Sequence, residues 1–161
     1  TLHTNDAVGA IPRLLDMGIE PFLLAAILRL VGAQRLVRKV CPHCRVSVPV
    51  SPEVRAILEA ELHAVPAVEK AEPNLRAPSA LSRGEGCTEC GGSGTTGRLA
   101  IVEVIPVWEE FRNAVIRRAS HDELRKLATA AGYLTMRQDG IVKALRGEVP
   151  LEEVLAATSE D

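Results

Sequence analysis

The chain has 161 residues, a formal net charge of −2, and ordinary apolar and charged fractions of 47% and 25%. These values favour a folded protein over a disordered one and give no electrostatic reason to expect a nucleic acid or an anionic membrane as partner. The aromatic residues are Phe22, Trp108, Phe111 and Tyr133, too few for a base-stacking platform. The longest apolar run, PFLLAAIL, is far shorter than the roughly 20 residues of a membrane-spanning helix, so no transmembrane segment is expected.

The first residues, TLHTN, predict the end of a strand that runs into a polar loop. Asn5 or Asp6 can then cap a helix through DAVGAIPRLLDMG, because short polar side chains accept hydrogen bonds from the free N–H groups of a first turn. Pro12 falls inside this helix and predicts a kink or a restart there. Gly18 is a suitable C-terminal cap.

The middle of the chain alternates between helix and strand signals. Pro21 suits the first turn of a second helix, and LVGAQRLVRKV (30–40) carries enough β-forming residues to predict a strand. A helix is expected over 52–62, whereas the proline-rich stretch 64–86 has little periodicity and predicts a flexible excursion. RLAIVEVIPV (98–107) predicts another strand.

The last third of the chain predicts helices. WEEFRNAVIRRA places Phe111, Val115 and Ile116 toward one apolar face. Ser120 and Glu123 have the spacing of a capping box at the start of the next helix. TMRQDGIVKALRG and PLEEVLAA predict two further helices.

The cysteines form two CxxC pairs, and none is left over. A tight CxxC turn places two sulfurs on one metal ion, and two such turns complete the tetrahedral thiolate set that Zn²⁺ prefers. We therefore predict a structural zinc site with the ligands Cys41, Cys44, Cys87 and Cys90. The two CxxC turns, 41–44 and 87–90, would form a zinc knuckle. The segment between them is long for a compact zinc ribbon, so its helix and proline-rich stretch would loop out of this knuckle. His43 is a further potential ligand, but we expect it to be an outer neighbour of the site or exposed.

Three other interpretations of these cysteines remain open. CPHC also occurs in oxidising thiol-disulfide enzymes, whose reactive thiolate lies at a helix N-terminus, but here the β-branched RVSVPV follows it and the second pair would have no role. Structural disulfides would suit an oxidising compartment, yet we see no secretion signal in these residues. CTECGGSG matches the CxxCxGxG zinc motif of J-domain co-chaperones, which carry several copies where this chain has one. We favour the structural metal site.

Several blocks outside the cysteines carry a wider resemblance. They are TLHTNDA, RLLDMGIEPF, QRLVRKVCPHC, GR followed by IVEV, DGIVKALRG and EEV. In this order and spacing, together with the second CxxC, nearly the whole chain resembles the secretion and pilus-assembly ATPases, namely the type II secretion ATPase and the type IV pilus extension ATPase. TLHTNDA corresponds to the His box of that family. Two departures are Thr95, where the family usually has an aromatic residue, and Pro12.

The resemblance implies an α/β fold in which the C-terminal piece of a RecA-like ATPase core precedes a zinc-knuckle insertion and a mostly helical C-terminal region. The corresponding divisions are 1–40 for the end of the core, 41–98 for the tetracysteine region, and 99–161 for the strand and helices that follow. In the family the Walker A and Walker B motifs lie upstream of the His box, and no GxxxxGK[ST] occurs here. We therefore expect a C-terminal fragment that does not hydrolyse ATP alone.

The resemblance also implies roles for residues near the start of the chain. His3, in the His box, would face the nucleotide and sense its γ-phosphate, the alternative being a loop or capping histidine. Thr1, Thr4 and Asn5 would lie in the nucleotide neighbourhood, or else serve as turn and cap residues. Arg13 would be a cation at a subunit interface, or a solvated helix residue.

The implied function is that of a hexameric cytoplasmic ATPase that uses ATP and Mg²⁺ to power type II secretion or type IV pilus assembly. Its partners would be the other subunits of a homohexamer and an inner-membrane platform protein, which would hold it at the membrane periphery. The alternative is a non-catalytic, zinc-stapled adaptor that binds protein, and a thiol-disulfide oxidoreductase is a third class. The histidines outside the motifs, His63 and His121, are expected to face solvent.

Overall fold

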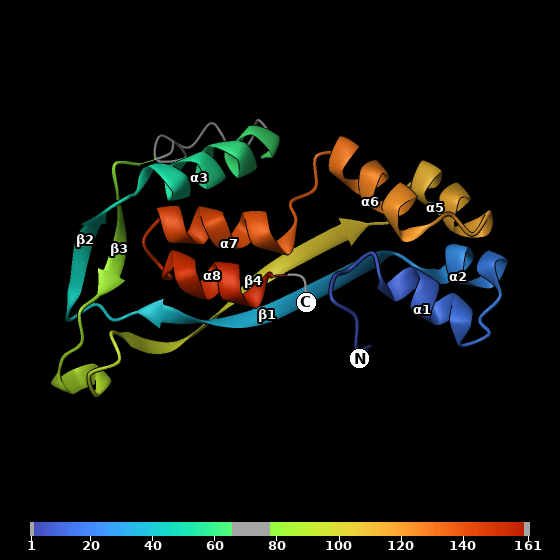
Figure 1. The fold of residues 1–161 in the computed structure, drawn as a ribbon. Helices are drawn as coiled ribbons and strands as arrows, with labels where there is room; N and C mark the ends of the chain where they lie inside the picture. Colours follow the sequence, from blue (N-terminus) through green and yellow to red (C-terminus); the bar gives the residue numbers. More distant parts are fainter. Residues whose placement is uncertain (1, 66–77, 160–161) are drawn as a thin grey trace. The chain divides into compact units, whose positions relative to one another are not determined.

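The structure is a computed structural model that describes residues 2–65 and 78–159. It is a mixed helix and strand fold that fits the α/β class (Figure 1). The long strands β1 (Leu30–Val40) and β4 (Thr95–Pro106) pair with each other and run in opposite directions. None of the helices in the described residues is both long and apolar enough to cross a membrane.

The chain divides into two compact units, and the division falls inside both long strands. Unit 1 comprises Thr1–Gln34 and Val102–Thr135, and unit 2 comprises Arg35–Ile101 and Met136–Asp161.

Unit 1 is built from helices around one apolar core. Its helices are α1 (Ala10–Asp16), α2 (Pro21–Ile27), α5 (Glu109–Ile116) and α6 (His121–Ala130). The helix α5 packs against both α2 and α6. Phe111 is completely buried in this core, together with Ala7, Val8, Ile11 and Leu124, and burial of such side chains supplies most of the stability of a unit of this size.

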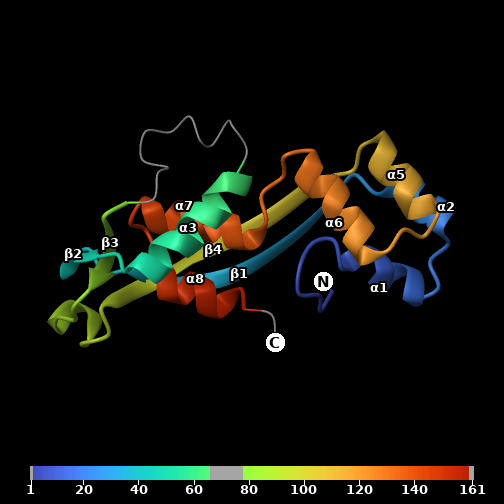
Figure 2. The ribbon, with the colours of Figure 1, turned by 45° about the horizontal axis from the view of Figure 1, so that its top comes forward.

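In its described residues, unit 2 combines a small antiparallel sheet with the three α-helices α3, α7 and α8. Its elements besides the long strands are β2 (Arg45–Pro49), α3 (Pro52–Ala64), β3 (Ala80–Gly84), η1 (Thr88–Cys90), α7 (Met136–Leu145) and α8 (Leu151–Ala157). In the β2–β3 pair Arg45 lies opposite Gly84 and Pro49 opposite Ala80. The helix α7 packs against α8, β3 and α3, and Figure 2 shows α3 lying beside α7.

Several predicted elements are confirmed. The strand β1 has the bounds predicted for it. Ser120 caps α6 and forms the expected capping box with Glu123. Gly18 has φ +88° and directly follows the C-cap of α1, which a residue with a Cβ atom rarely tolerates.

Other local expectations were wrong, each for a physical reason. The helix α1 begins at Ala10 and not near Asp6, so Pro12 lies in its first turn, where its missing N–H has no intrahelical partner to lose, and not inside a longer helix. Ile116 is 45% exposed, and Ala114 occupies the buried face instead. Part of the predicted excursion 64–86 is regular, because 80–84 pairs with β2 as β3, whereas 66–77 lies outside the described residues.

Candidate functional site: a tetracysteine metal centre

The four cysteines come together in unit 2 from two distant parts of the chain. Cys41 directly follows β1, and Cys44 directly precedes β2. Cys87 and Cys90 are the N-cap and the last residue of the 3₁₀ turn η1. All four Sγ atoms lie within 4.8 Å of one another, so the group could hold a metal ion.

The sulfur positions fit a tetrahedral thiolate site. The Sγ atoms of Cys41 and Cys87 are 3.9 Å apart, those of Cys44 and Cys90 are 3.9 Å apart, and those of Cys87 and Cys90 are 3.7 Å apart. Four sulfurs at about 2.3 Å from a central Zn²⁺ would be separated by about 3.8 Å from one another. A disulfide needs about 2.05 Å between its sulfurs, and all four cysteines are free.

Backbone N–H groups point at two of the sulfurs. Cys90 Sγ accepts hydrogen bonds from the N–H groups of Cys87 (3.1 Å) and Gly94 (3.2 Å), and Cys44 Sγ accepts one from Gly86 N–H (3.3 Å). The hydrogen bonds from Cys87 and Gly94 lower the pKa of the Cys90 thiol to about 6, which favours the thiolate that a metal ligand requires. Burial raises the pKa of Cys44 to about 12, so a metal would have to displace its proton.

Close backbone contacts between glycines join the chain segments that precede and follow the turn η1. A Cβ atom added to Gly94 would lie 2.3 Å from the carbonyl oxygen of Gly84, and one added to Gly86 would lie 2.5 Å from that of Gly92. Gly94 also has φ +71°. Only glycine permits this approach with this backbone conformation.

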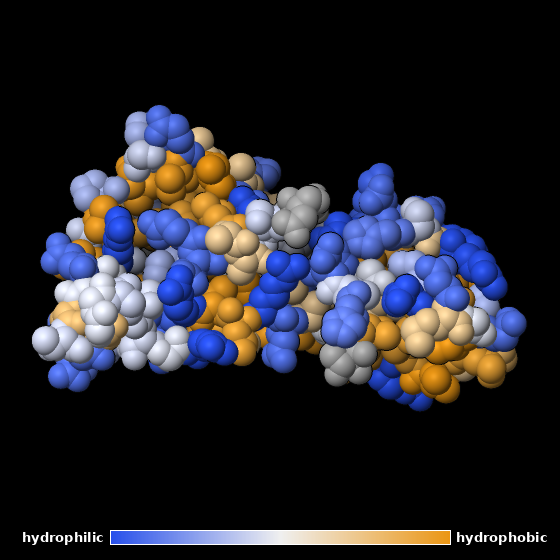
Figure 3. All heavy atoms as spheres, turned by 60° about the horizontal axis from the view of Figure 1, so that its bottom comes forward, coloured by the Kyte–Doolittle hydropathy of each residue, from blue (hydrophilic) through white to orange (hydrophobic). Residues whose placement is uncertain are grey.

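The knuckle has no apolar core of its own. Its turn η1 contains no buried residue, and the glycine-, serine- and threonine-rich segment 91–95 belongs to the pale region at the left of Figure 3, which is neither strongly hydrophobic nor hydrophilic. A segment without a core needs another source of stability, and a bound metal ion is the usual one in small excursions of this kind.

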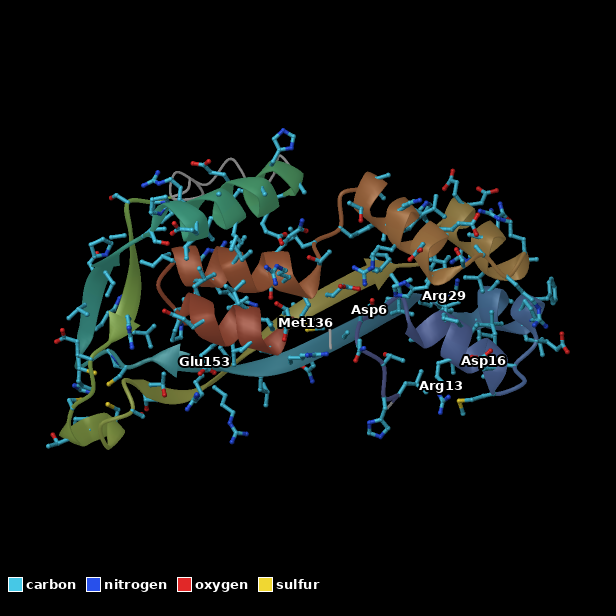
Figure 4. All side chains as sticks on the ribbon, viewed as in Figure 1. Asp6, Arg13, Asp16, Arg29, Met136 and Glu153 are labelled. Carbon is cyan, nitrogen blue, oxygen red and sulfur yellow. The ribbon has the colours of Figure 1, made fainter. Side chains whose placement is uncertain are left out.

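The other residues predicted for the nucleotide site and the subunit interface belong to unit 1, near the start of the chain. His3, Asn5 and Arg13 are exposed, and Figure 4 shows Arg13 on α1. Thr4 is half-buried, and its hydroxyl donates a hydrogen bond to the backbone carbonyl of Asp6 (2.9 Å). Thr1 lies outside the described residues. His43 is exposed between Cys41 and Cys44, and His63 is exposed on α3.

Sequence reasoning missed a cluster around Asp6 in unit 1. His121, predicted to face solvent, places Nε2 2.8 Å from Asp6 Oδ2, and Arg125 also donates to Asp6 Oδ2. Asp6 Oδ1 accepts the N–H of Gly9 at 2.6 Å. Asp6 therefore lies in a turn before α1 and is not the N-cap, which is Gly9.

A buried carboxylate contacts the same loop. Glu103 is 3% exposed, and its Oε1 accepts the N–H of Ala7 at 3.1 Å. The burial of Glu103 was predictable from the alternation of side chains along β4, because Glu103 shares the inward face with Ile101 and Ile105. A carboxylate on an inward face requires a hydrogen-bond donor.

The Asp6 cluster makes the stability of unit 1 dependent on pH. Burial raises the pKa of Asp6, but the hydrogen bonds from Gly9 and His121 and the charges of Arg125 and His121 outweigh it, so the pKa is lower than usual. A carboxyl group with a lowered pKa stabilises the fold above its unfolded pKa of about 4 and loses this contribution as pH falls through the folded value. We therefore expect the free energy of unfolding, measured by urea unfolding at a series of pH values, to fall less steeply below about pH 4 in Asp6→Asn than in the wild type. Asp16→Asn, which replaces an exposed residue of α1, is the control and should show the wild-type pH dependence.

Comparison with known proteins places these features in a family. The family model for "Type II/IV secretion system protein" matches residues 1–156. The chain belongs to this family. The match includes both CxxC pairs and the loop that carries Asp6, so both clusters lie within the family region of the chain.

Relatives of known function belong to two related systems. The chain is 45% identical over 163 residues to the type IV pilus assembly ATPase PilB of Thermus thermophilus, covering 99% of this chain and 17% of that protein. It is 40% identical to the type II secretion system protein E of Aeromonas hydrophila and 42% identical to that of Pseudomonas aeruginosa, covering 100% of this chain and 29% of each relative. The chain thus spans less than a third of the length of these relatives.

Proposed function

We propose that this chain is the zinc-bearing, C-terminal part of a hexameric cytoplasmic ATPase that powers type II secretion or type IV pilus assembly. The names of its relatives support the motor role. The observation that carries the zinc assignment is the convergence of two distant CxxC pairs on one point. The proposed α/β architecture has the end of a RecA-like core before the knuckle and a helical region after it.

The zinc ion would be held by Cys41, Cys44, Cys87 and Cys90. With four thiolate ligands the site is closed, so the ion supplies structural stability and no open position for a substrate. The N–H groups of Cys87, Gly86 and Gly94 would offset the negative charge of the four thiolates. The knuckle would then act as a rigid extension that passes motion of the motor to a membrane partner.

The nucleotide role belongs to the loop at the start of the chain. His3 is exposed, so its ring is free to meet the γ-phosphate of ATP bound with Mg²⁺. Thr1, Thr4 and Asn5 would line the same neighbourhood. Arg13, exposed on α1, would contact the next subunit of the hexamer. A platform protein of the inner membrane would be the further partner, and it would keep the ATPase at the membrane periphery.

The test of the zinc-stapled motor is a double variant in the cell that carries the gene for this chain. Cys41→Ser with Cys44→Ser removes one half of the thiolate set and is expected to abolish secretion or pilus assembly. His43→Ala, an exposed residue between the same two cysteines, is the matched control and is expected to keep wild-type function. Wild-type secretion or piliation by the double variant would discard the proposal.

A non-catalytic adaptor is the second candidate, and the absence of a GxxxxGK[ST] motif from the 161 residues favours it for the isolated chain. Both candidates predict that the purified 161-residue chain does not hydrolyse ATP. Turnover above background, measured by phosphate release and abolished by EDTA, would contradict this. ATP hydrolysis that depends on secretion, measured in cells for a protein that contains this chain, would favour the motor over the adaptor.

A further inference from the structure

One carboxylate makes the side-chain hydrogen bonds that the described residues show between the His-box loop, residues 2–9, and α6. Asp6 Oδ2 accepts hydrogen bonds from His121 and Arg125, the first residue of α6 and one in its second turn. Asp6 Oδ1 accepts the N–H of Gly9. One side chain thus joins the loop, the start of α1 and the helix α6. We call this set of contacts the Asp6 clamp.

The loop is buried on one side of Asp6 and exposed on the other. Ala7 and Val8, which follow it, are 0% and 1% exposed, and the Asp6 side chain itself is 17% exposed. His3, only a few residues earlier, is exposed. Figure 4 places Asp6 on the loop that precedes α1. Asp6 therefore lies where the loop passes from the core to the solvent.

We propose that Asp6 is a positioning residue for His3: through the clamp, α6 sets the direction in which the His-box loop leaves the core. The proposal rests on the proposed nucleotide role of His3. Ala7 and Val8 are held separately, by the bond from Ala7 N–H to Glu103 and by burial in the core, so a small shift of α6 would act through the clamp on the exposed part of the loop that precedes Ala7. Movement of α6 would thereby reach the nucleotide without any residue of α6 touching it.

Contacts with Gly9, Thr4 and Arg125 restrict the conformation of Asp6 and of the turn that contains it. A Cβ atom at Gly9 would lie 3.0 Å from Asp6 Oδ1, so a side chain at this position would crowd the carboxylate. Thr4 donates to the carbonyl of Asp6 and fixes the turn on the side of His3. The ion pair with Arg125 is partly shielded from water, since the two side chains are 33% and 17% exposed, and it is screened less than a surface pair.

The first experiment measures the loop directly in the 161-residue chain. We expect Asp6→Asn to raise amide hydrogen exchange at Gly9 by about tenfold, because it weakens the hydrogen bond from Gly9 N–H, and Arg125→Met to raise it by less; both should shift the NMR signals of the His3 ring. Lys126→Met, an exposed neighbour of Arg125 on α6, is the control and should change neither. Arg125→Lys, which keeps the charge, should restore part of the protection.

Two outcomes would overturn the proposal. One is wild-type exchange and unchanged His3 signals in folded Asp6→Asn and Arg125→Met chains. The other is an equal change of amide exchange and of the His3 signals in Lys126→Met and Arg125→Met. If Asp6→Asn fails to fold, Arg125→Met decides alone, because it retains the hydrogen bonds of Asp6 to Gly9 and His121.

A second experiment separates the clamp from the proposed function. In an ATPase that contains this chain, a displaced His3 is expected to lower kcat by about tenfold or more while KM for ATP changes little, because misplaced groups act on the transition state more than on binding. Altered exchange in Asp6→Asn with unchanged kcat would contradict the role of His3 and leave the clamp. A lower kcat with unchanged exchange would contradict the clamp and leave the role of His3.

Discussion

Replacing Cys90 with serine is expected to abolish tight zinc binding and to destabilise unit 2 by about 3 kcal/mol or more, lowering its Tm by about 12 °C or more. Serine can still accept the N–H groups of Cys87 and Gly94 that now point at the sulfur. The variant therefore removes the thiolate ligand and leaves the surrounding hydrogen bonds. Elemental analysis should give about one zinc per wild-type chain and far less in the variant, and calorimetry gives the Tm.

The matched control is Glu89→Gln, an exposed residue between Cys87 and Cys90. It should retain one zinc and the wild-type Tm. A strong chelator should bring the wild-type Tm down to that of Cys90→Ser, and excess zinc should restore it. Equal melting of wild type, variant and chelated protein would show that the knuckle does not depend on a metal.

Replacing Gly94 with alanine is expected to lower the free energy of unfolding of unit 2 by about 3 kcal/mol or more, because two effects add. Its φ of +71° is unfavourable for a residue with a Cβ atom, and that atom would lie 2.3 Å from the carbonyl oxygen of Gly84. The obstacle is backbone, so a change of rotamer cannot relieve it. Since Gly94 also donates its N–H to Cys90 Sγ, displacement of this segment should weaken zinc binding as well.

Gly91 provides the control for the conformational effect alone. It has φ +59°, but nothing lies within 4 Å of the Cβ atom that alanine would add. Gly91→Ala should therefore cost only about 1–2 kcal/mol and leave zinc affinity near wild type. Competition with a chromophoric chelator measures the affinity. Equal affinity and equal stability in the two variants would contradict the close packing of Gly84 against Gly94.

The cysteine cluster, which could hold a metal ion, was accessible from the sequence because its signal is local and chemical. Each CxxC turn is specified within four residues, and the chain contains two pairs and no further cysteine. The strand β1 was equally accessible, since Val31, Val37 and Val40 are β-formers among the eleven residues that precede Cys41. In both cases the information lies in adjacent residues.

The Asp6 clamp could not be predicted in this way. Asp6 and Arg125 are 119 positions apart, and local rules assign a polar residue before a helix to capping. His121, at the first position of α6, looks like a solvated helix residue until the loop that covers it is known. The strand β3 was missed because ALSRG has little β-branched character and is regular only through its pairing with β2.

The most direct measurement of the central claim is X-ray absorption at the zinc edge of the purified chain. One zinc surrounded by four sulfur atoms at about 2.3 Å is the expected result, with no nitrogen or oxygen neighbour. A shell with two or fewer sulfurs, or a chain that binds no zinc and contains disulfides instead, would contradict the proposal that both cysteine pairs hold one ion.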